Sequence, residues 1–311
     1  MQFSLVGKVS KAHRFEYSWR DVVLYALGVG AKRAELDFLY EGTRADGKRG
    51  PLVLPSFAVV PKFGPMMELL QDAEVDLAMV VHGGEKIELL QPLPHEGVLL
   101  TTATIRGIYD MRKFAFVLVD TESKNEAGEV ITRTTSNIIV REAGGFGGGL
   151  APKEETFAVP KDVPAAFQCE EKTSEEQALL YRLSGDYNPL HADPAFAKKV
   201  GFDQPILHGL CTYGYAVRHL VNGLLGGDPT RLRSFDAQFK RPVLPGDTFV
   251  TEGFRGQGDD EKKVALRVSV KPRAVSTESR EGSATSSEGA GAPPATAAGE
   301  QVLGRAWARL A

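Results

Sequence analysis

The chain has 311 residues, of which 42% are hydrophobic and 25% are charged, and its formal net charge is −3. These values are typical of globular proteins, and the length is enough for two ordinary domains. The slightly negative charge argues against broad attraction to nucleic acid or anionic membranes, and no apolar run is long enough to span a bilayer. With Cys169 and Cys211 as the two cysteines, neither a disulfide framework nor a tetrahedral zinc site is expected.

This cysteine usage favours a reducing cytoplasm. The N-terminal stretch lacks the apolar core and small-residue cleavage site of a secretory signal. The C-terminus shows no evident peroxisomal signal. We therefore expect a cytoplasmic protein, or a peroxisomal one if the source is eukaryotic.

Residues 1–143 are predicted to form the first of two halves. Ser18 to Asp21 resembles a capping box, which predicts a helix that runs to about Leu27. Stretches with strand composition follow at 75–81, 86–90, 98–106, 113–123 and 130–140.

A glycine-rich break at 144–149 and a Pro/Lys/Glu-rich stretch predict a flexible linker at 144–163. In the second half, 164–311, helices are predicted after the capping box Thr173–Glu176, after Asp193-Pro194, and from Leu207 to the glycines 226–227. Strands are predicted at 232–240, 248–254, 264–270 and 302–310. The Ser/Ala/Gly-rich stretch 277–299 is predicted to be a disordered insertion.

Both halves place a helix before strands with one buried face. One long helix against an antiparallel sheet, made twice, is an α+β architecture. The sequence therefore predicts a duplicated α+β fold, although the identity between the two halves is slight.

One short stretch gathers groups with acid/base chemistry. Asp186, Asn188 and His191 lie within six residues, around a glycine and a proline that force a turn. A carboxylate and an imidazole so placed can converge on one water molecule, and the imidazole changes protonation near neutral pH. The same pattern is common in structural loops, where Asp and Asn bond their own backbone. Both interpretations stand on the residues alone.

The segment Pro205-Ile-Leu-His-Gly-Leu210 opens the predicted long helix. A glycine at this position often serves close packing. Alternatively, the backbone N–H of Gly209 points at a negative charge, helped by the helix dipole.

Together these motifs resemble a known family. The stretch Y-R-L-S-G-D-Y-N-P-L-H at 181–191 resembles the signature of the type 2 enoyl-CoA hydratases, the MaoC-like hydratases of the hot-dog fold. P-I-L-H-G-L-C-T-Y-G at 205–214 resembles the start of that family's central helix. With matches at 25–30, 81–85 and 144–148, the similarity spans nearly the whole chain and indicates a double-hot-dog member, like the hydratase part of peroxisomal multifunctional enzyme type 2.

The resemblance implies tandem hot-dog folds, each a long central helix wrapped by an antiparallel sheet. It also implies reversible hydration of trans-2-enoyl-CoA to (3R)-3-hydroxyacyl-CoA, without metal or cofactor, because coenzyme A arrives with the substrate. Asp186 and His191 match the catalytic pair, and the N–H of Gly209 matches the donor that holds the thioester oxygen. The substrate contacts that the resemblance implies are Asn188, His82, Gly83 and Phe239.

The sequence also departs from the family. Sliding the first half over the second places Gly30 at Asp186 and Glu35 at His191, so the first half lacks the pair. We expect one active site per chain and, as a hypothesis, space in the first half for a long acyl tail. Lys113 is a candidate for binding a CoA phosphate, but Met111-Arg112 precedes it and leaves the identity of that cation open.

Three alternatives remain beside the hydratase. The first is a dehydratase that acts on an acyl carrier protein, or a hydratase for a specialised acyl thioester. The second is a hot-dog thioesterase, which would not need both Asp186 and His191. The third is a non-catalytic binding protein, against which the intact pair argues. Family resemblance suggests a homodimer.

Overall fold

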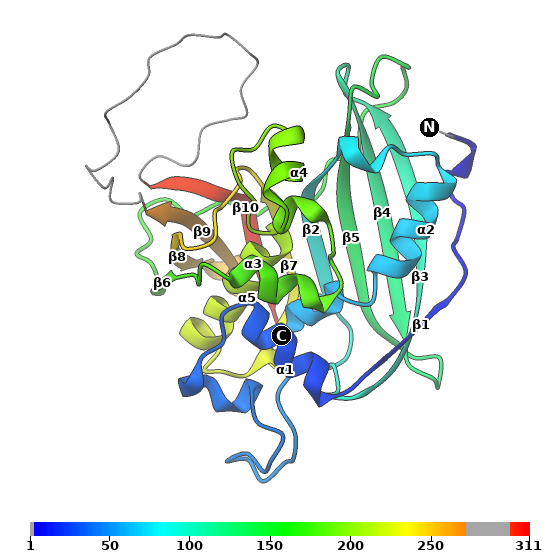
Figure 1. Ribbon diagram of the computed structural model, residues 1–311. Helices are drawn as coiled ribbons and strands as arrows, with labels where there is room; N and C mark the ends of the chain where they lie inside the picture. The colour runs from blue at the N-terminus through cyan, green and yellow to red at the C-terminus, as the bar shows by residue number, and fades with distance from the viewer. Residues whose placement is uncertain (1–2, 272–298) are drawn as a thin grey trace.

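The computed structural model describes residues 3–271 and 299–311, whose strands form one antiparallel sheet of ten strands (Figure 1). The order across the sheet is β1-β3-β4-β5-β2-β7-β10-β9-β8-β6. The predicted α+β class is confirmed. The predicted insertion at 277–299 lies, except for Gly299, outside the described residues. The first half supplies β1 (His13–Tyr17), β2 (Val80–Leu89), β3 (Gly97–Asp110), β4 (Phe114–Lys124) and β5 (Val130–Arg141). The second supplies β6 (Phe167–Lys172), β7 (Leu232–Phe239), β8 (Thr248–Arg255), β9 (Lys263–Lys271) and β10 (Glu300–Leu310).

The two halves meet where β2 pairs with β7, so their sheets are continuous. Gly84 lies opposite Gln238, and a Cβ at Gly84 would approach the carbonyl oxygen of Ala237 to 2.8 Å. A register shift between His82 and Gly84 marks a bulge in the pairing of β2 with β5. Such bulges re-aim side chains, and this one lies at the seam between the halves.

The central helix of the second half is α5 (Gly209–Leu224), whose side chains from Leu210 to Val221 are buried. The predicted apolar stripe is therefore buried, and α5 packs against β6, β7 and β8 of the sheet. Beside α5, α1 (Trp19–Gly28) packs on α3 (Gln177–Tyr181). The side-chain amide of Gln177 donates to the carbonyl of Gly28 at 2.7 Å, which ties the equivalent helices of the two halves together.

The first half departs from the prediction of one long central helix. A 3-10 turn (Pro55–Val59) and the ten-residue α2 (Phe63–Asp72) take its place. Prolines at 51, 55, 61 and 65 interrupt the segment, because proline lacks an N–H and clashes with the preceding turn. The strands predicted at 75–81 and 86–90 are replaced by the single β2, which runs through the glycine pair at 83–84, whereas residues 77–79 form a 3-10 turn. The strands β1 and β6 were not predicted.

The helix starts predicted at Ser18, Thr173 and Asp193 have different outcomes. The helix predicted after Ser18 is α1, where the Asp21 carboxylate accepts the N–H of Ser18 at 2.8 Å. The box at Thr173 does not form as predicted, because the buried Thr173 hydroxyl accepts the N–H of Gly246 at 2.8 Å. The short α4 (Pro194–Lys199) begins as predicted, with the Asp193 side chain accepting from Ala195 N–H.

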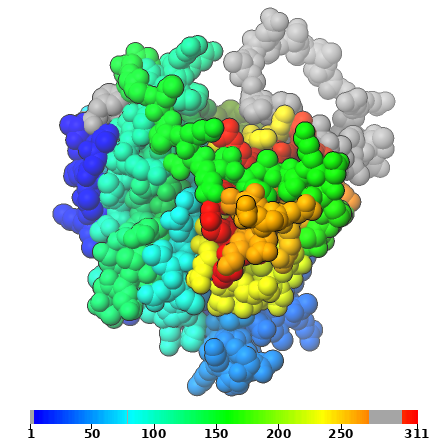
Figure 2. All heavy atoms as spheres, turned by 180° about the vertical axis from the view of Figure 1, so that it is seen from behind, coloured from blue at the N-terminus to red at the C-terminus, as the bar shows by residue number. Residues whose placement is uncertain are grey.

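Residues 144–166 contain no helix or strand and follow the outer face of the sheet. Glu154 pairs with Arg106 of β3 at 2.8 Å, and Glu155 pairs with Lys263 of β9 and Arg309 of β10 at 3.1 and 3.0 Å. Figure 2 shows the two halves side by side on this face. Within 3–271 and 299–311, no helix is long and apolar enough to cross a membrane.

Candidate active site

The loop before α4 holds the predicted acid/base residues. Gly185 has φ +117°, a conformation that side chains disfavour, and this turn directs the chain into Asp186. The Asn188 side chain accepts the N–H of Leu190 at 3.0 Å and caps the 3-10 turn Pro189–His191. Asn188 is exposed, whereas His191 is buried. The loop therefore has the local backbone bonds of a structural turn, but it also buries an imidazole.

Two histidines join this loop to the start of α5, because each ring bonds a backbone carbonyl of the other segment. His191 Nδ1 lies 2.9 Å from the carbonyl oxygen of Ile206, and His208 Nε2 lies 3.2 Å from that of Asp186. The two rings stack, with centroids 3.6 Å apart. Because a carbonyl oxygen can only accept, both nitrogens carry hydrogen, and His191 Nε2 is left as an acceptor.

The electrostatics of this group favour a neutral base. Burial lowers the pKa of His191, and the nearby Arg182 cation adds to this effect, while the Asp186 carboxylate opposes it. Burial lowers the pKa of His208 further. A carboxylate oxygen of Asp186 and one ring nitrogen from each of His191 and His208 lie within 4.8 Å of one another. A carboxylate and a neutral imidazole at this separation can hold one water molecule between them.

The remaining contacts come from both sides of the seam. The His82 ring meets the face of Phe239 edge-on, with centroids 5.1 Å apart. A Cβ at Gly209 would lie 3.1 Å from the Phe239 ring, which explains the need for glycine there. As the first residue of α5, Gly209 has an N–H without an intrahelical acceptor, at the positive end of the helix dipole. Gly83, which follows His82 in β2, is half-buried in the same strand.

Lys113 lies apart from this group. It is exposed in the turn between β3 and β4, and β5 separates β4 from β2. Phe114 pairs with Arg141, whose neighbour Val140 pairs with Val80, so Lys113 lies near the sheet end where β2 begins. Its contact with a CoA phosphate stays a prediction.

The sequence analysis missed a buried polar cluster beside His82. Lys62 and Glu85 form an ion pair and Ser136 donates to Glu85 at 2.9 Å, and all three side chains are fully buried. Glu85 also bonds His82 Nε2 at 3.0 Å. Only the placement of Glu85 three residues after His82, in a predicted strand, hinted at such a cluster.

The positions of the first half that align with the catalytic pair have other contacts. Gly30, at φ +83°, lies against the Tyr215 ring, and Glu35 accepts two hydrogen bonds from Arg218 at 2.9 and 2.8 Å. Glu171, close to Cys169 and His219 in a second group of donor atoms, also pairs with Arg218 at 2.6 Å. The Arg218 guanidinium therefore supplies a positive charge beside Glu171 in this group.

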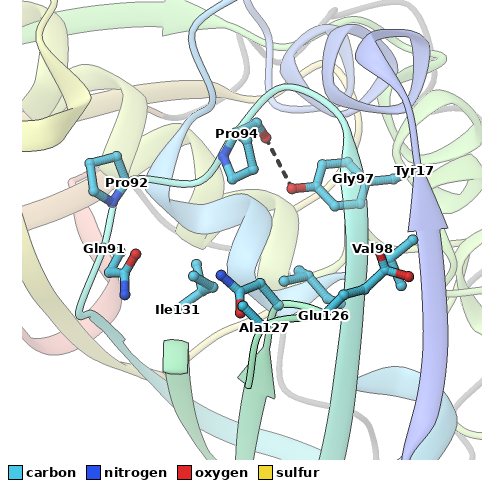
Figure 3. A pocket seen from close by; sticks show the side chains of 11 residues that line it. Tyr17, Gln91, Pro92, Pro94, Gly97, Val98, Glu126, Ala127 and Ile131 are labelled. Atoms are coloured by element: carbon cyan, nitrogen blue, oxygen red, sulfur yellow. Dashed lines mark hydrogen bonds between the residues drawn. The ribbon is translucent and has the colours of Figure 1, made fainter. Parts of the chain in front are cut away.

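A hollow of about 430 Å³ lies elsewhere, between the corner at Gln91–Pro94 and the β4–β5 turn. Tyr17 donates to the Pro94 carbonyl at 3.0 Å in its wall (Figure 3). Gln91 follows Gly83 by eight residues along an extended strand, roughly 25 Å. This hollow is therefore distinct from the candidate active site.

A continuous sheet around a buried helix, with an Asp/His loop at the helix start, defines a MaoC-like double-hot-dog protein. The MaoC like domain model matches residues 157–274, and the MFE-2 hydratase 2 N-terminal domain model matches residues 15–142. The chain belongs to the MaoC-like hydratase 2 family.

The similar proteins agree with this assignment. Peroxisomal enoyl-CoA hydratase 2 of Arabidopsis thaliana is 38% identical over 257 residues, covering 77% of this chain and 82% of the relative. 3-Hydroxyacyl-thioester dehydratase Y of Mycobacterium tuberculosis is 38% identical over 252 residues, covering 79% and 84%. The crystal structure of a MaoC-like dehydratase from Phytophthora capsici has a TM-score of 0.77 at 28% identity, covering 100% and 99%.

Proposed function

We propose that this protein is a hydro-lyase that adds water reversibly to trans-2-enoyl-CoA and yields (3R)-3-hydroxyacyl-CoA. The observation that carries the proposal is the convergence of Asp186 and His191 at the start of α5, with the tautomer of His191 set by the Ile206 carbonyl. The names of the similar proteins, an enoyl-CoA hydratase and a 3-hydroxyacyl-thioester dehydratase, describe the two directions of this reaction.

The proposed chemistry needs a bound water molecule, groups that accept and deliver its proton, and a donor that stabilises the negative charge developing on the thioester oxygen. The water oxygen bonds C3 of the enoyl group while a water proton passes to the Asp186/His191 pair, and the pair delivers a proton to C2. Neutral His191 Nε2 serves as acceptor because burial lowers the pKa of its imidazole. The Gly209 N–H stabilises the enolate-like thioester oxygen, assisted by the α5 dipole. These residues supply the acid, the base and the oxyanion donor, so the proposal involves no metal or cofactor.

The remaining assignments rest on the same resemblance. We assign substrate contacts to His82, Gly83, Asn188 and Phe239, and a CoA phosphate to Lys113. One site per chain follows from the Gly30 and Glu35 contacts, with the first half giving room to the acyl tail. Two such chains as a homodimer, in the cytoplasm or in peroxisomes, complete the proposal. An acyl-carrier-protein substrate is the second candidate, since the same pair serves either carrier.

The enoyl-thioester absorbance band tests the reaction. Purified protein is mixed with crotonyl-CoA and with trans-2-decenoyl-CoA, and the product is resolved by chiral chromatography. We expect loss of the band and a (3R) product, and the faster substrate gives the chain-length preference. No loss with either CoA ester, but loss with a crotonyl-acyl-carrier-protein, would favour the second candidate. Active-site titration should give one site per chain, and two sites would contradict the single-site assignment.

A further inference from the structure

The buried cluster beside His82 joins three elements of the first half. Lys62 precedes α2, Glu85 lies in β2 and Ser136 lies in β5, and the Lys62 ammonium donates to Ser136 Oγ at 2.8 Å and to Glu85. A lysine and a glutamate are almost never fully buried unless they are paired, because each charge loses its hydration. Removing either partner is costly, so the pair suggests a role beyond packing.

His82 is the member of this cluster that reaches the candidate active site. Its side chain is 23% exposed, whereas those of Lys62 and Glu85 are fully buried. Glu85 Oε2 lies 3.0 Å from His82 Nε2, and a carboxylate can only accept, so Nε2 carries the hydrogen. The other nitrogen, Nδ1, is then an acceptor. The ring that carries it makes a T-shaped contact with the Phe239 ring.

Three charged groups act on His82 from the elements packed around it. They are Lys62 before α2, Glu85 within β2 and Asp186 in the loop after α3. Burial lowers the pKa of His82 and the Lys62 cation lowers it further, while both carboxylates oppose this. Burial disfavours charge on Glu85, but the Lys62 cation and His82 together keep the pKa of its carboxyl below the ordinary value.

We propose that Lys62 and Glu85 are positioning residues that hold His82 as the neutral Nε2–H tautomer, so that an uncharged acceptor nitrogen faces the candidate active site. Without Lys62, His82 would be the one cation adjacent to the buried Glu85 carboxylate, and it would take up a proton. A protonated ring has no acceptor nitrogen and adds a positive charge near Asp186. The first half thus contributes a polar group of defined protonation to the site. This inference rests on the proposed function for its activity readout.

Histidine titration by NMR tests the proposal independently of activity. The His82 signal is assigned by its loss in His82→Gln. In the wild-type protein we expect the titration midpoint of His82 to lie below the ordinary imidazole value of about 6.5. In Lys62→Met we expect its titration midpoint to rise by about one unit or more. In Lys62→Met/Glu85→Gln, which removes both charges, the midpoint should fall again.

Activity should follow the same order. At pH 6, Lys62→Met should lose about tenfold in kcat/KM relative to its value at pH 8, and the double variant should regain most of it. The matched control is Lys86→Met, which removes a partly exposed lysine of the same strand as Glu85, paired with Glu88 at 2.7 Å. It should leave the titration and the pH profile unchanged.

Two results would overturn the proposal. One is a wild-type His82 that titrates at or above the ordinary imidazole value, a result for which neither Lys62 variant has to fold. The other is a Lys62→Met protein, folded by circular dichroism, in which the His82 midpoint does not move. A shifted His82 midpoint without hydratase activity in any variant would support the charge pair and reject the proposed function instead.

Discussion

Replacing Arg218 with methionine removes a buried cation that joins the two halves; the exposed Lys32 also pairs with Glu171, at 2.9 Å. The Arg218 Nε donates to the Val29 carbonyl at 2.8 Å, and its other nitrogens bond Glu35 at 2.9 and 2.8 Å and Glu171 at 2.6 Å. The side chains of Arg218 and Glu171 are 3% and 8% exposed. Methionine retains the volume of the stem but leaves two carboxylates without their guanidinium.

The expected cost follows from the burial of that charge. Breaking a buried ion pair on one side costs about 3–5 kcal/mol, because the remaining charge loses its buried partner; here Glu171 keeps only the exposed Lys32 ammonium. An unfolding entropy of about 2.1 cal/mol/K per residue makes 1 kcal/mol worth roughly 1.5 °C in a chain of this size. Arg218→Met should therefore lower the melting temperature by about 5–8 °C. Arg218→Met/Glu171→Gln should recover part of this, since it removes the stranded carboxylate.

Calorimetry and urea unfolding at pH 7 measure this effect. The matched control is Arg267→Met, an exposed arginine 3.1 Å from Glu252, which should cost less than about 1 kcal/mol. Burial opposes charge on Glu171, but its bond to His219 and the Arg218 cation lower the pKa of its carboxyl from 4.5 to about 2. Wild-type stability should therefore fall as the pH drops from about 4.5 towards 2, and Arg218→Met should show a weaker fall. An Arg218→Met protein as stable as Arg267→Met would refute this reasoning.

Three further predictions concern single side chains. Burial raises the pKa of Asp236 to about 7 from 3.8, so the folded state binds more protons in this window and loses stability as the pH rises through it. Asp236→Asn should melt higher than wild type at pH 8, by a smaller margin at pH 5, and equally below about pH 4. A margin that does not shrink as the pH falls would contradict the burial argument. Gly209→Ala should lower kcat/KM at least about tenfold by displacing Phe239, whereas the control Gly149→Ala, with nothing within 4 Å of its Cβ, should not. His208→Phe keeps the stacked ring but loses the bond to the Asp186 carbonyl, so kcat should fall about three- to tenfold with KM retained; a change in KM alone would argue against a positioning role.

The sequence predicts the second half well because its signals are local. The apolar stripe from Leu207, the glycines that end it and the Asp193-Pro194 start each specify their element within a few residues. The first half is harder, because prolines divide its central helix and a glycine pair lies inside β2. The edge strands β1 and β6 depend on distant partners, which a local pattern does not contain.

The site divides in the same way. Asp186 and His191 lie in one motif, and the structure brings them together, while their catalytic roles remain proposals. The contacts of His208 and of the Lys62–Glu85 pair could not be predicted from the sequence, because folding brings the partners together. Lys62 and Glu85 are 23 residues apart, and Lys62 and Ser136 are 74 apart. Lys113 was a candidate on the family resemblance, and the structure leaves it exposed; its contact with a CoA phosphate stays a prediction.

The most direct test of the central claim compares Asp186→Asn with Asp193→Asn in the hydration of crotonyl-CoA. Both changes replace one carboxylate by an amide in the same segment, but Asp193 caps α4, a role that asparagine also fills. We predict that Asp186→Asn loses at least about a hundredfold in kcat, the usual contribution of a general acid/base group. Asp193→Asn should remain close to wild type. Hydration that survives in Asp186→Asn, or is lost equally in both variants, would contradict the assignment of the chemistry to Asp186 and His191.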